Sequence, residues 1–579
     1  MSTRKFVHPE FRLVNWESIK PYFDELLQRP INSLQDLEKF LEDSSELSAV
    51  IEEDLAWRYI QMTCDTENQE KAEHYKYFVT QIQPHIAPVS NKIDKKILAS
   101  PFLEELRQNP DYEMMIKELQ KEVELFREEN VPIIAEIQAL QQQYAQITGS
   151  MTVHIQGKEM TLQQANALLE SPDRALREEA WIKINQRRYV DKEKLDELMT
   201  VLIGKRHQVA LNAGFANYRD YAFKLRSRYD YTPQDCFRFH EAVKEEVVPL
   251  LNELALQRKQ IMNLPTLRPW DKKADKTGKP PIKTFDTIEN FIKNSIRALQ
   301  QVDESYADVI RTMHELKRLD LDSRKGKAPG GYNYPLYESG YPFIFMNASG
   351  TVRDLVTMMH EAGHAVHSVL TKDLKLIAFK QLPAEIAELA SMSMELLTMP
   401  YWHYFIGNDD PQMAQNVIRA QLDHLEDIIG TLPWVATVDK FQHWLYENPH
   451  HTVEERHRTW IEIADSFSDN ITDMSGLEHF KAISWQRQLH IFEIPFYYIE
   501  YGIAQLGSIG VWKNFIENPQ KAREQYKKAL SLGYTRSLRK VYETAGVKFD
   551  FSAEYIRELM SFVRQKIDEL NNQLYENIS

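Results

Sequence analysis

Apolar residues recur at intervals of three and four over most of the chain, which is the spacing of one face of an α-helix. Over residues 1–200 the pattern is interrupted mainly by turn signals such as Arg29-Pro30 and Asn109-Pro110. It returns from Trp434 to about Leu570 with no change in composition. We therefore predict a mainly α-helical protein with an N-terminal helical lobe at residues 1–200 and a second domain at residues 201–579.

Three segments depart from the helical pattern. Residues 151–160 alternate apolar and polar positions around Gly157-Lys158, which predicts a small β-hairpin. Residues 263–281 lose all periodicity, and so long a loop is typical of a functional or disordered segment. Residues 323–340 are rich in glycine and tyrosine, and the apolar run 342–347 after them predicts a strand, hence a small sheet.

A helix is predicted directly after this strand. Thr351 and Asp354 form an acidic capping box, and apolar residues follow at helical spacing (Leu355, Val356, Met359, Val366, Val369). Gly363 costs this helix about 1 kcal/mol relative to alanine. We interpret it as a clearance position for something that approaches the backbone closely, such as a neighbouring strand or a bound chain.

His360 and His364 lie four residues apart on this helix, so both imidazoles can reach one zinc ion. Glu361 lies beside that position without pointing at it. A catalytic zinc needs a third protein ligand, for which Glu385, Glu388 and Glu395 are the candidates.

Glu388 and Glu395 fall on one face of a predicted helix, seven residues apart. We prefer Glu388 as the ligand and Glu395 as the acceptor behind it, because ligating histidines usually donate their other nitrogen to an acceptor. The alternative is a core helix with two hydrogen-bonded histidines. This alternative does not explain why the histidine pair occurs together with a capped helix and downstream acidic residues. If the helix carries a zinc site, we expect the strand at 342–347 to offer an edge to an extended peptide substrate.

Composition narrows the function further. The 579 residues carry a net charge of -15, which argues against nucleic acid or an acidic membrane as a partner. Cys64 and Cys236 are too few for a disulfide framework, so we expect two buried thiols and a reducing compartment. The chain shows no signal peptide and no run of eighteen apolar residues, which predicts a cytoplasmic location.

A histidine and several tyrosines gather in the otherwise apolar stretch 490–501. Buried tyrosines need hydrogen-bond partners, and a substrate oxyanion is one such partner. From the pattern alone, core packing is the favoured role for this stretch.

Several stretches together resemble the thimet oligopeptidase family of zinc metallopeptidases, most closely its oligoendopeptidase F and Pz-peptidase branch. The matching stretches are residues 214–219, 267–271, 326–332, 360–367, 388–395 and 490–501. The resemblance implies two helical lobes around a deep substrate channel, with a small sheet beside the active-site helix in a zincin-like arrangement. It places the catalytic metallopeptidase domain in residues 201–579.

The resemblance also implies one zinc per chain, held by His360, His364 and Glu388. It implies that Glu361 is the general base and that His490 and nearby tyrosines hold the scissile carbonyl. Among those tyrosines we favour Tyr498 and Tyr501, with Tyr497 left open. His367 matches the family's longer motif but would over-fill the site, so we assign it a supporting role.

The expected function is a zinc-dependent oligoendopeptidase in which zinc-activated water, with Glu361 as base, hydrolyses internal bonds of short peptides. Two alternatives stay open: a zinc carboxypeptidase on a related helical scaffold, and a non-catalytic peptide-binding protein. We expect a monomer or weak homo-oligomer. Nitrogen and carboxylate ligands accept several divalent ions, so cobalt or manganese also fits the metal site.

Overall fold

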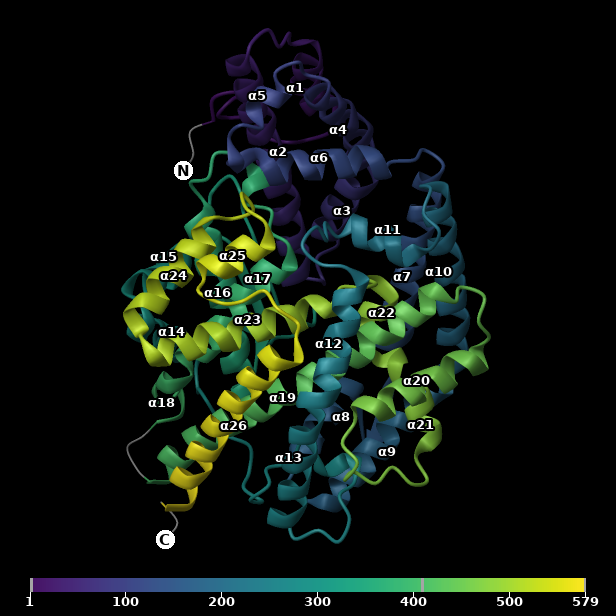
Figure 1. The fold of residues 1–579 in the computed structure, drawn as a ribbon, viewed down its shortest axis with the longest axis vertical. Helices are drawn as coiled ribbons and strands as arrows, with labels where there is room; N and C mark the ends of the chain where they lie inside the picture. The colour runs from purple at the N-terminus through teal and green to yellow at the C-terminus, as the bar shows by residue number, and fades with distance from the viewer. Residues whose placement is uncertain (1–3, 408–410, 577–579) are drawn as a thin grey trace. The chain divides into compact units, whose positions relative to one another are not determined.

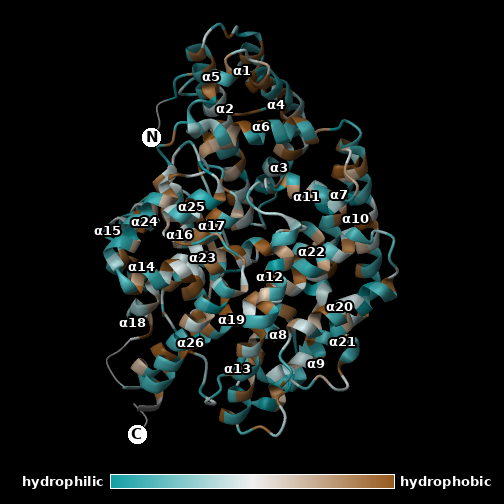
Figure 2. Ribbon diagram, in the orientation of Figure 1, coloured by the Kyte–Doolittle hydropathy of each residue, from teal (hydrophilic) through white to brown (hydrophobic). Residues whose placement is uncertain are grey.

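The computed structural model describes residues 4–407 and 411–576. The chain divides into two compact units, each built from separated segments. Unit 1 comprises residues 1–125, 283–417 and 507–549, and unit 2 comprises residues 126–282, 418–506 and 550–579. Nearly all elements are helices, and most carry both apolar and polar residues (Figure 2). The predicted mainly α-helical class is confirmed, whereas the predicted division at residue 200 stays a prediction.

Unit 1 contains helices from the N-terminal, middle and C-terminal parts of the chain (Figure 1). Its helices are α1 (Trp16–Gln28), α2 (Leu34–Cys64), α3 (Gln69–Tyr77), α4 (Gln83–Leu98), α5 (Leu103–Leu106), α6 (Glu113–Leu125), α14 (Ile288–Val302), α15 (Glu304–Glu315), α16 (Val352–Thr371), α17 (Ala384–Thr398), α18 (His403–Ile406), α24 (Pro519–Ser531) and α25 (Leu538–Thr544). Its strands are β3 (Leu319–Asp322), β4 (Tyr332–Tyr334) and β5 (Phe343–Ala348).

Unit 2 contains the hairpin β1 (Thr152–Ile155) and β2 (Lys158–Thr161). Its helices are α7 (Asn130–Gly149), α8 (Leu162–Ala167), α9 (Arg174–Val190), α10 (Lys192–Asn212), α11 (Tyr218–Leu225), α12 (Pro233–Glu246), α13 (Val248–Ile261), α20 (Val453–Phe467), α21 (Glu478–Ala482), α22 (Leu489–Glu493) and α26 (Ala553–Glu576). Two helices, α19 (Pro411–Glu447) and α23 (Tyr498–Glu517), run from one unit into the other.

The small sheet of unit 1 has the strand order β3-β5-β4. β5 pairs in parallel with β3 and antiparallel with β4, so that Ile344 lies opposite both Leu319 and Asn333. The predicted strand at 342–347 is therefore present, but it is the central strand. Its expected role as a substrate-binding edge is wrong, because β5 is hydrogen-bonded to a strand on both sides. The edge strands of this sheet are β3 and β4.

The sheet lies between two helices of unit 1. Ala56 and Ile60 of α2 pack with Phe343 and Phe345 of β5 in one buried cluster, while α16 contacts β4 and β5. α16 begins directly after β5, with the predicted capping box between Thr351 and Asp354. The sheet thus fixes the start of the helix that carries the histidine pair.

The predicted hairpin is confirmed in unit 2, where β1 and β2 pair antiparallel. Its turn residues Gln156 and Gly157 both have positive φ, 49° and 77°, as tight hairpin turns require. The aperiodic loop 263–281 is ordered through Asp271, which is fully buried and accepts hydrogen bonds from Arg174 and Arg177.

None of the helices in the described ranges combines the length and the apolar character needed to cross a membrane. Cys236 is buried, as predicted. Cys64 is only partly buried, so the expectation of two buried thiols is wrong for this residue, which ends α2.

Candidate metal centre

The predicted metal-binding residues come together within unit 1. α16 supplies His360 and His364, and α17 supplies Glu388. One ligand atom from each of the three lies within 4.8 Å of the others. The Nε2 atoms of His360 and His364 are 3.2 Å and 3.8 Å from Oε2 of Glu388. Zinc–ligand bonds of about 2.0–2.1 Å at tetrahedral angles require donor atoms about 3.3 Å apart, so the three residues fit a zinc ion.

Close packing of the two helices produces this convergence. α16 and α17 lie side by side (Figure 1), and Gly363 faces α17. A β-carbon at Gly363 would lie 2.6 Å from Cα of Ser391 and 2.7 Å from the carbonyl oxygen of Ala390, closer than carbon atoms approach without displacement. Gly363 is thus a clearance position, as predicted, but the neighbour is a helix rather than a strand or bound chain.

Two side chains on α17 orient the candidate ligands. Nδ1 of His360 is 2.6 Å from Oε1 of Glu395, the predicted arrangement behind the metal. Ser391 donates a hydrogen bond to Oε2 of Glu388 at 3.0 Å. Ser391 was not among the residues predicted for the site; its position three residues after Glu388 on a helix is the sequence signal that could have found it.

Glu361 is 7% exposed, and its Oε2 atom has no hydrogen-bond partner among the described residues. Burial, with Glu388 and Glu395 nearby, raises the pKa of Glu361 to about 7. A carboxyl group of this kind is suited to accept a proton near neutral pH. On the sheet side, Asn333 of β4 donates a hydrogen bond to the backbone oxygen of Glu361 at 3.2 Å.

The electrostatics of the centre favour a cation. Burial opposes a charge on His360, but its hydrogen bonds to Glu388 and Glu395 raise its pKa above the usual value. Burial alone would raise the pKa of Glu388, but His360 and His364 lower it to about 2. The carboxylates of Glu388 and Glu395, which favour the protonated form of His360, would equally attract a divalent ion.

Burial is the dominant influence on the ionisation of His364 and His367. Burial lowers the pKa of His364 to about 4 and that of His367 to about 3, which keeps both imidazoles neutral at pH 7. His367 is 1% exposed and lies outside the metal-binding group of the described residues. This placement agrees with a supporting role.

The remaining predicted site residues cluster within unit 2. The ring centroid of His490 is 5.0 Å from that of Tyr498 and 5.8 Å from that of Tyr501. Tyr497 is equally near, at 5.7 Å. Gln488 holds Nδ1 of His490 at 2.8 Å. The rings therefore form one cluster, which belongs to unit 2, whereas the metal centre belongs to unit 1.

Comparison with known proteins identifies the family. The model of peptidase family M3 matches residues 167–561, and that of the peptidase M3 N-terminal domain matches residues 6–126. The chain belongs to peptidase family M3. This membership confirms the resemblance described from the sequence, and it confirms the expected class of enzyme, a metallo-oligopeptidase.

Individual relatives agree with this assignment. The chain is 23% identical to oligopeptidase PepF of Bacillus subtilis over 56% of its own length and 48% of that protein. It is 22% identical to group B oligopeptidase PepB of Streptococcus agalactiae over 73% of its length and 68% of that protein. The solved structure of Pz peptidase A with an inhibitor has a TM-score of 0.88 and 26% identity, and the match covers 97% of this chain and 99% of that one.

Proposed function

We propose that this protein is a zinc-dependent oligoendopeptidase that hydrolyses internal bonds of short peptides. The observation that carries the proposal is the convergence of His360, His364 and Glu388 within 4.8 Å, with Glu361 directly following the first histidine. Bound there, zinc would supply Lewis-acid chemistry, polarising a carbonyl and lowering the pKa of water from about 15.7 toward 7.

Glu361 carries the proton transfers in this proposal. Its Oε2 atom is buried and without a hydrogen-bond partner among the described residues, so it is available to accept a proton from the attacking water. The same oxygen then donates that proton to the leaving amine nitrogen. Glu395 holds the His360 ring through Nδ1, which leaves Nε2 for the metal.

We assign substrate positioning to two further features. β4 forms one edge of the sheet beside α16, and an extended peptide would add to it through main-chain hydrogen bonds that do not depend on side-chain identity. His490, Tyr498 and Tyr501 keep the role implied by the family resemblance, which is to donate hydrogen bonds to the scissile carbonyl as its oxygen gains negative charge.

The test is product mapping by mass spectrometry on a mixed library of peptides of about 5 to 30 residues, a range suited to a site that encloses its ligand. Internal cleavage that a chelator abolishes and added zinc restores is the expected result. Release of C-terminal residues alone would support the carboxypeptidase alternative. A zinc-loaded protein that binds peptides uncut would support the binding-protein alternative.

A further inference from the structure

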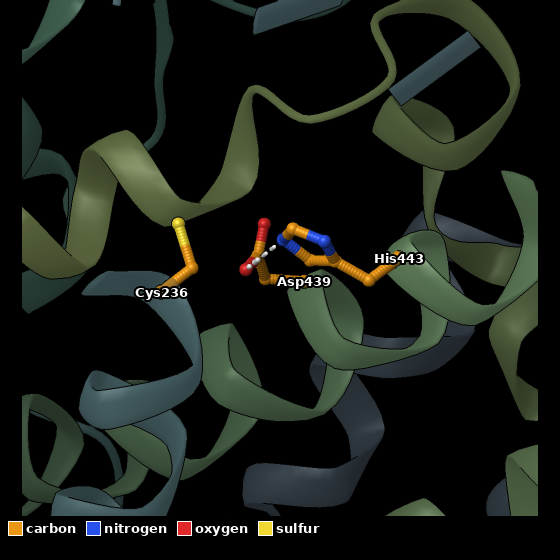
Figure 3. Close-up of side chains that lie close together, drawn as sticks. All are labelled: Cys236, Asp439 and His443. Carbon is orange, nitrogen blue, oxygen red and sulfur yellow. Dashed lines mark ion pairs between the residues drawn. The ribbon is translucent and has the colours of Figure 1, made fainter. Parts of the chain in front are cut away.

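A second group of metal-binding side chains lies in unit 2. α12 carries Cys236 and His240, and α19 carries Asp439 and His443. Each pair is four residues apart, so its two side chains project from the same face of their helix. Figure 3 shows the side chains of Cys236, Asp439 and His443 close together, and one ligand atom from each lies within 4.8 Å of the others.

His240 lies beside this group of three and would be a fourth ligand, although none of its ring nitrogens lies within 4.8 Å of all three. Its Nε2 atom is 2.8 Å from Oδ2 of Asp439, and Nε2 of His443 is 3.3 Å from the same oxygen. Asp439 thus lies between two imidazoles, with the cysteine beside it. One thiol, one carboxylate and two imidazoles are the donor types found in four-coordinate zinc sites.

The group is almost completely removed from solvent. Exposed fractions are 2% for Cys236, 1% for His240, 0% for Asp439 and 2% for His443. Among the described residues, Oδ1 of Asp439 and the Nδ1 atoms of both histidines have no hydrogen-bond partner. Buried polar atoms are nearly always paired, so several unpaired atoms in one cluster require an explanation.

The surroundings of His443 are aromatic. Its ring centroid lies 5.7 Å from that of Phe223, 4.8 Å from that of Phe237 and 5.2 Å from that of Phe496. Apolar walls of this kind offer no polar partners to the unpaired atoms. The nearby Arg228 already binds Glu500 at 3.2 Å and the backbone oxygen of Phe496.

Charge balance also favours a divalent cation. A thiolate and a carboxylate together carry two negative charges, and two neutral imidazoles add none. Burial raises the pKa of the Cys236 thiol, which is therefore neutral without a metal; a bound divalent ion would displace the thiol proton, and the thiolate and the carboxylate would then cancel its charge. Metal bonds of about 2.0–2.3 Å require the ligand atoms to approach to about 3.3–3.8 Å, so metal binding would draw together the three atoms that lie within 4.8 Å and turn His240 toward them.

We propose that Cys236, His240, Asp439 and His443 bind a second divalent metal ion, zinc or another ion that accepts a thiolate. Because protein side chains fill all four positions, the site would have no place for substrate and would stabilise the packing of α12 against α19. It is independent of the proposed peptidase centre, whose ligands lie in unit 1 and include no sulfur.

Cobalt substitution of the full-length protein tests the proposal, because only a cobalt–thiolate bond gives an intense near-ultraviolet charge-transfer band. The band is expected in the wild-type protein and in a His360→Ala/His364→Ala variant, which lacks the first site. It is expected to disappear in Cys236→Ser and to persist in the matched control Cys64→Ser. Absence of the band in the double variant, or its persistence in Cys236→Ser, would overturn the proposal.

Zinc content gives a second measurement that does not depend on how Cys236→Ser folds. Elemental analysis should find two zinc ions per chain in the wild-type protein and one in the His360→Ala/His364→Ala variant. No zinc in a folded double variant that has been incubated with excess zinc and desalted would mean that the cluster is only a hydrogen-bonded part of the core. Failure of the peptidase assay would leave both readouts unchanged, so the two proposals fail separately.

Discussion

Nδ1 of His360 lies 2.6 Å from Oε1 of Glu395, two turns beyond the candidate ligand Glu388 on the same helix. This contact fixes the ring orientation and leaves Nε2 of His360 for a metal. We predict that Glu395→Gln weakens zinc binding by about 10- to 100-fold, the usual effect of removing such a partner. Chelator competition measures the affinity, and excess zinc should restore turnover.

Glu385→Gln is the matched control for this prediction. It alters a buried glutamate of α17 that lies outside the metal-binding group. Its zinc affinity should stay close to that of the wild-type protein. Equal zinc affinity in Glu395→Gln and the wild-type protein would contradict a role for this contact in holding the metal.

Glu361→Gln should reduce turnover without weakening zinc binding. Glutamine keeps the shape of the side chain but cannot accept the proton, so turnover should fall by about 10²- to 10⁴-fold. Zinc content should not change, because Glu361 is not among the three residues of the group. Near-normal peptide cleavage by a zinc-loaded Glu361→Gln protein would rule out this residue as the base.

Gly363→Ala tests the packing of α16 against α17. The added methyl group would lie 2.6 Å from Cα of Ser391, and overpacking of this kind destabilises by about 1–3 kcal/mol. Gly204→Ala on α10 is the control, since nothing lies within 4 Å of its β-carbon position; it should stabilise by about 0.5–1 kcal/mol. Thermal unfolding should therefore shift in opposite directions, and equal shifts would show that Gly363 has room.

Asp94 on α4 should make stability depend on pH. Burial, with a smaller effect from Glu122, raises the pKa of Asp94 from 3.8 to about 7. Between these values the folded protein binds more protons than the unfolded chain, so this group lowers stability as pH rises through that window. Asp94→Asn should be more stable than the wild-type protein above pH 7, by on the order of 1 kcal/mol after allowance for solvent screening, and equally stable near pH 4.

Thermal unfolding of both proteins at several pH values measures this effect. Asp24→Asn is the control, because its carboxylate is 43% exposed and binds Lys20 at the surface. That variant should show no gain at high pH. A gain for Asp94→Asn that is the same at pH 4 and pH 8 would show that ionisation of Asp94 is not its cause.

The tyrosine cluster can be resolved by single hydroxyl deletions. If Tyr498 and Tyr501 donate to the developing oxyanion, each change to phenylalanine should lower kcat by up to about 10²- to 10³-fold with little change in KM. Tyr497→Phe serves as the comparison within the same cluster. An effect confined to Tyr497→Phe would reassign the role, and no effect in any variant would leave the cluster as core packing.

Local rules account for the side-chain arrangement of the candidate site that could be predicted from the sequence. The capping box of α16, the four-residue spacing of His360 and His364, and the seven-residue spacing of Glu388 and Glu395 all depend on helix geometry alone.

Long-range pairing accounts for what the sequence could not show. The central place of β5 depends on pairing with β3 and β4, and nothing in its own residues distinguishes a central strand from an edge strand. The second metal-binding group also depends on contacts between distant parts of the chain, because His240 and Asp439 are 199 residues apart. Only their four-residue spacings, repeated on two helices, hinted that these residues belong together.

Unit 1 combines segments from the beginning, middle and last parts of the sequence, which determines the order in which its helices are synthesised. The hydroxyl groups of Tyr526 and Tyr542 donate to the backbone oxygens of Ala390 and Glu385, so the helix that carries Glu388 is covered by segments synthesised near the end of the chain. A nascent chain that has passed α16 and α17 already contains every proposed zinc ligand but lacks this cover. During translation the proposed zinc ligands therefore emerge before α24 and α25, which carry the tyrosines that cover this helix.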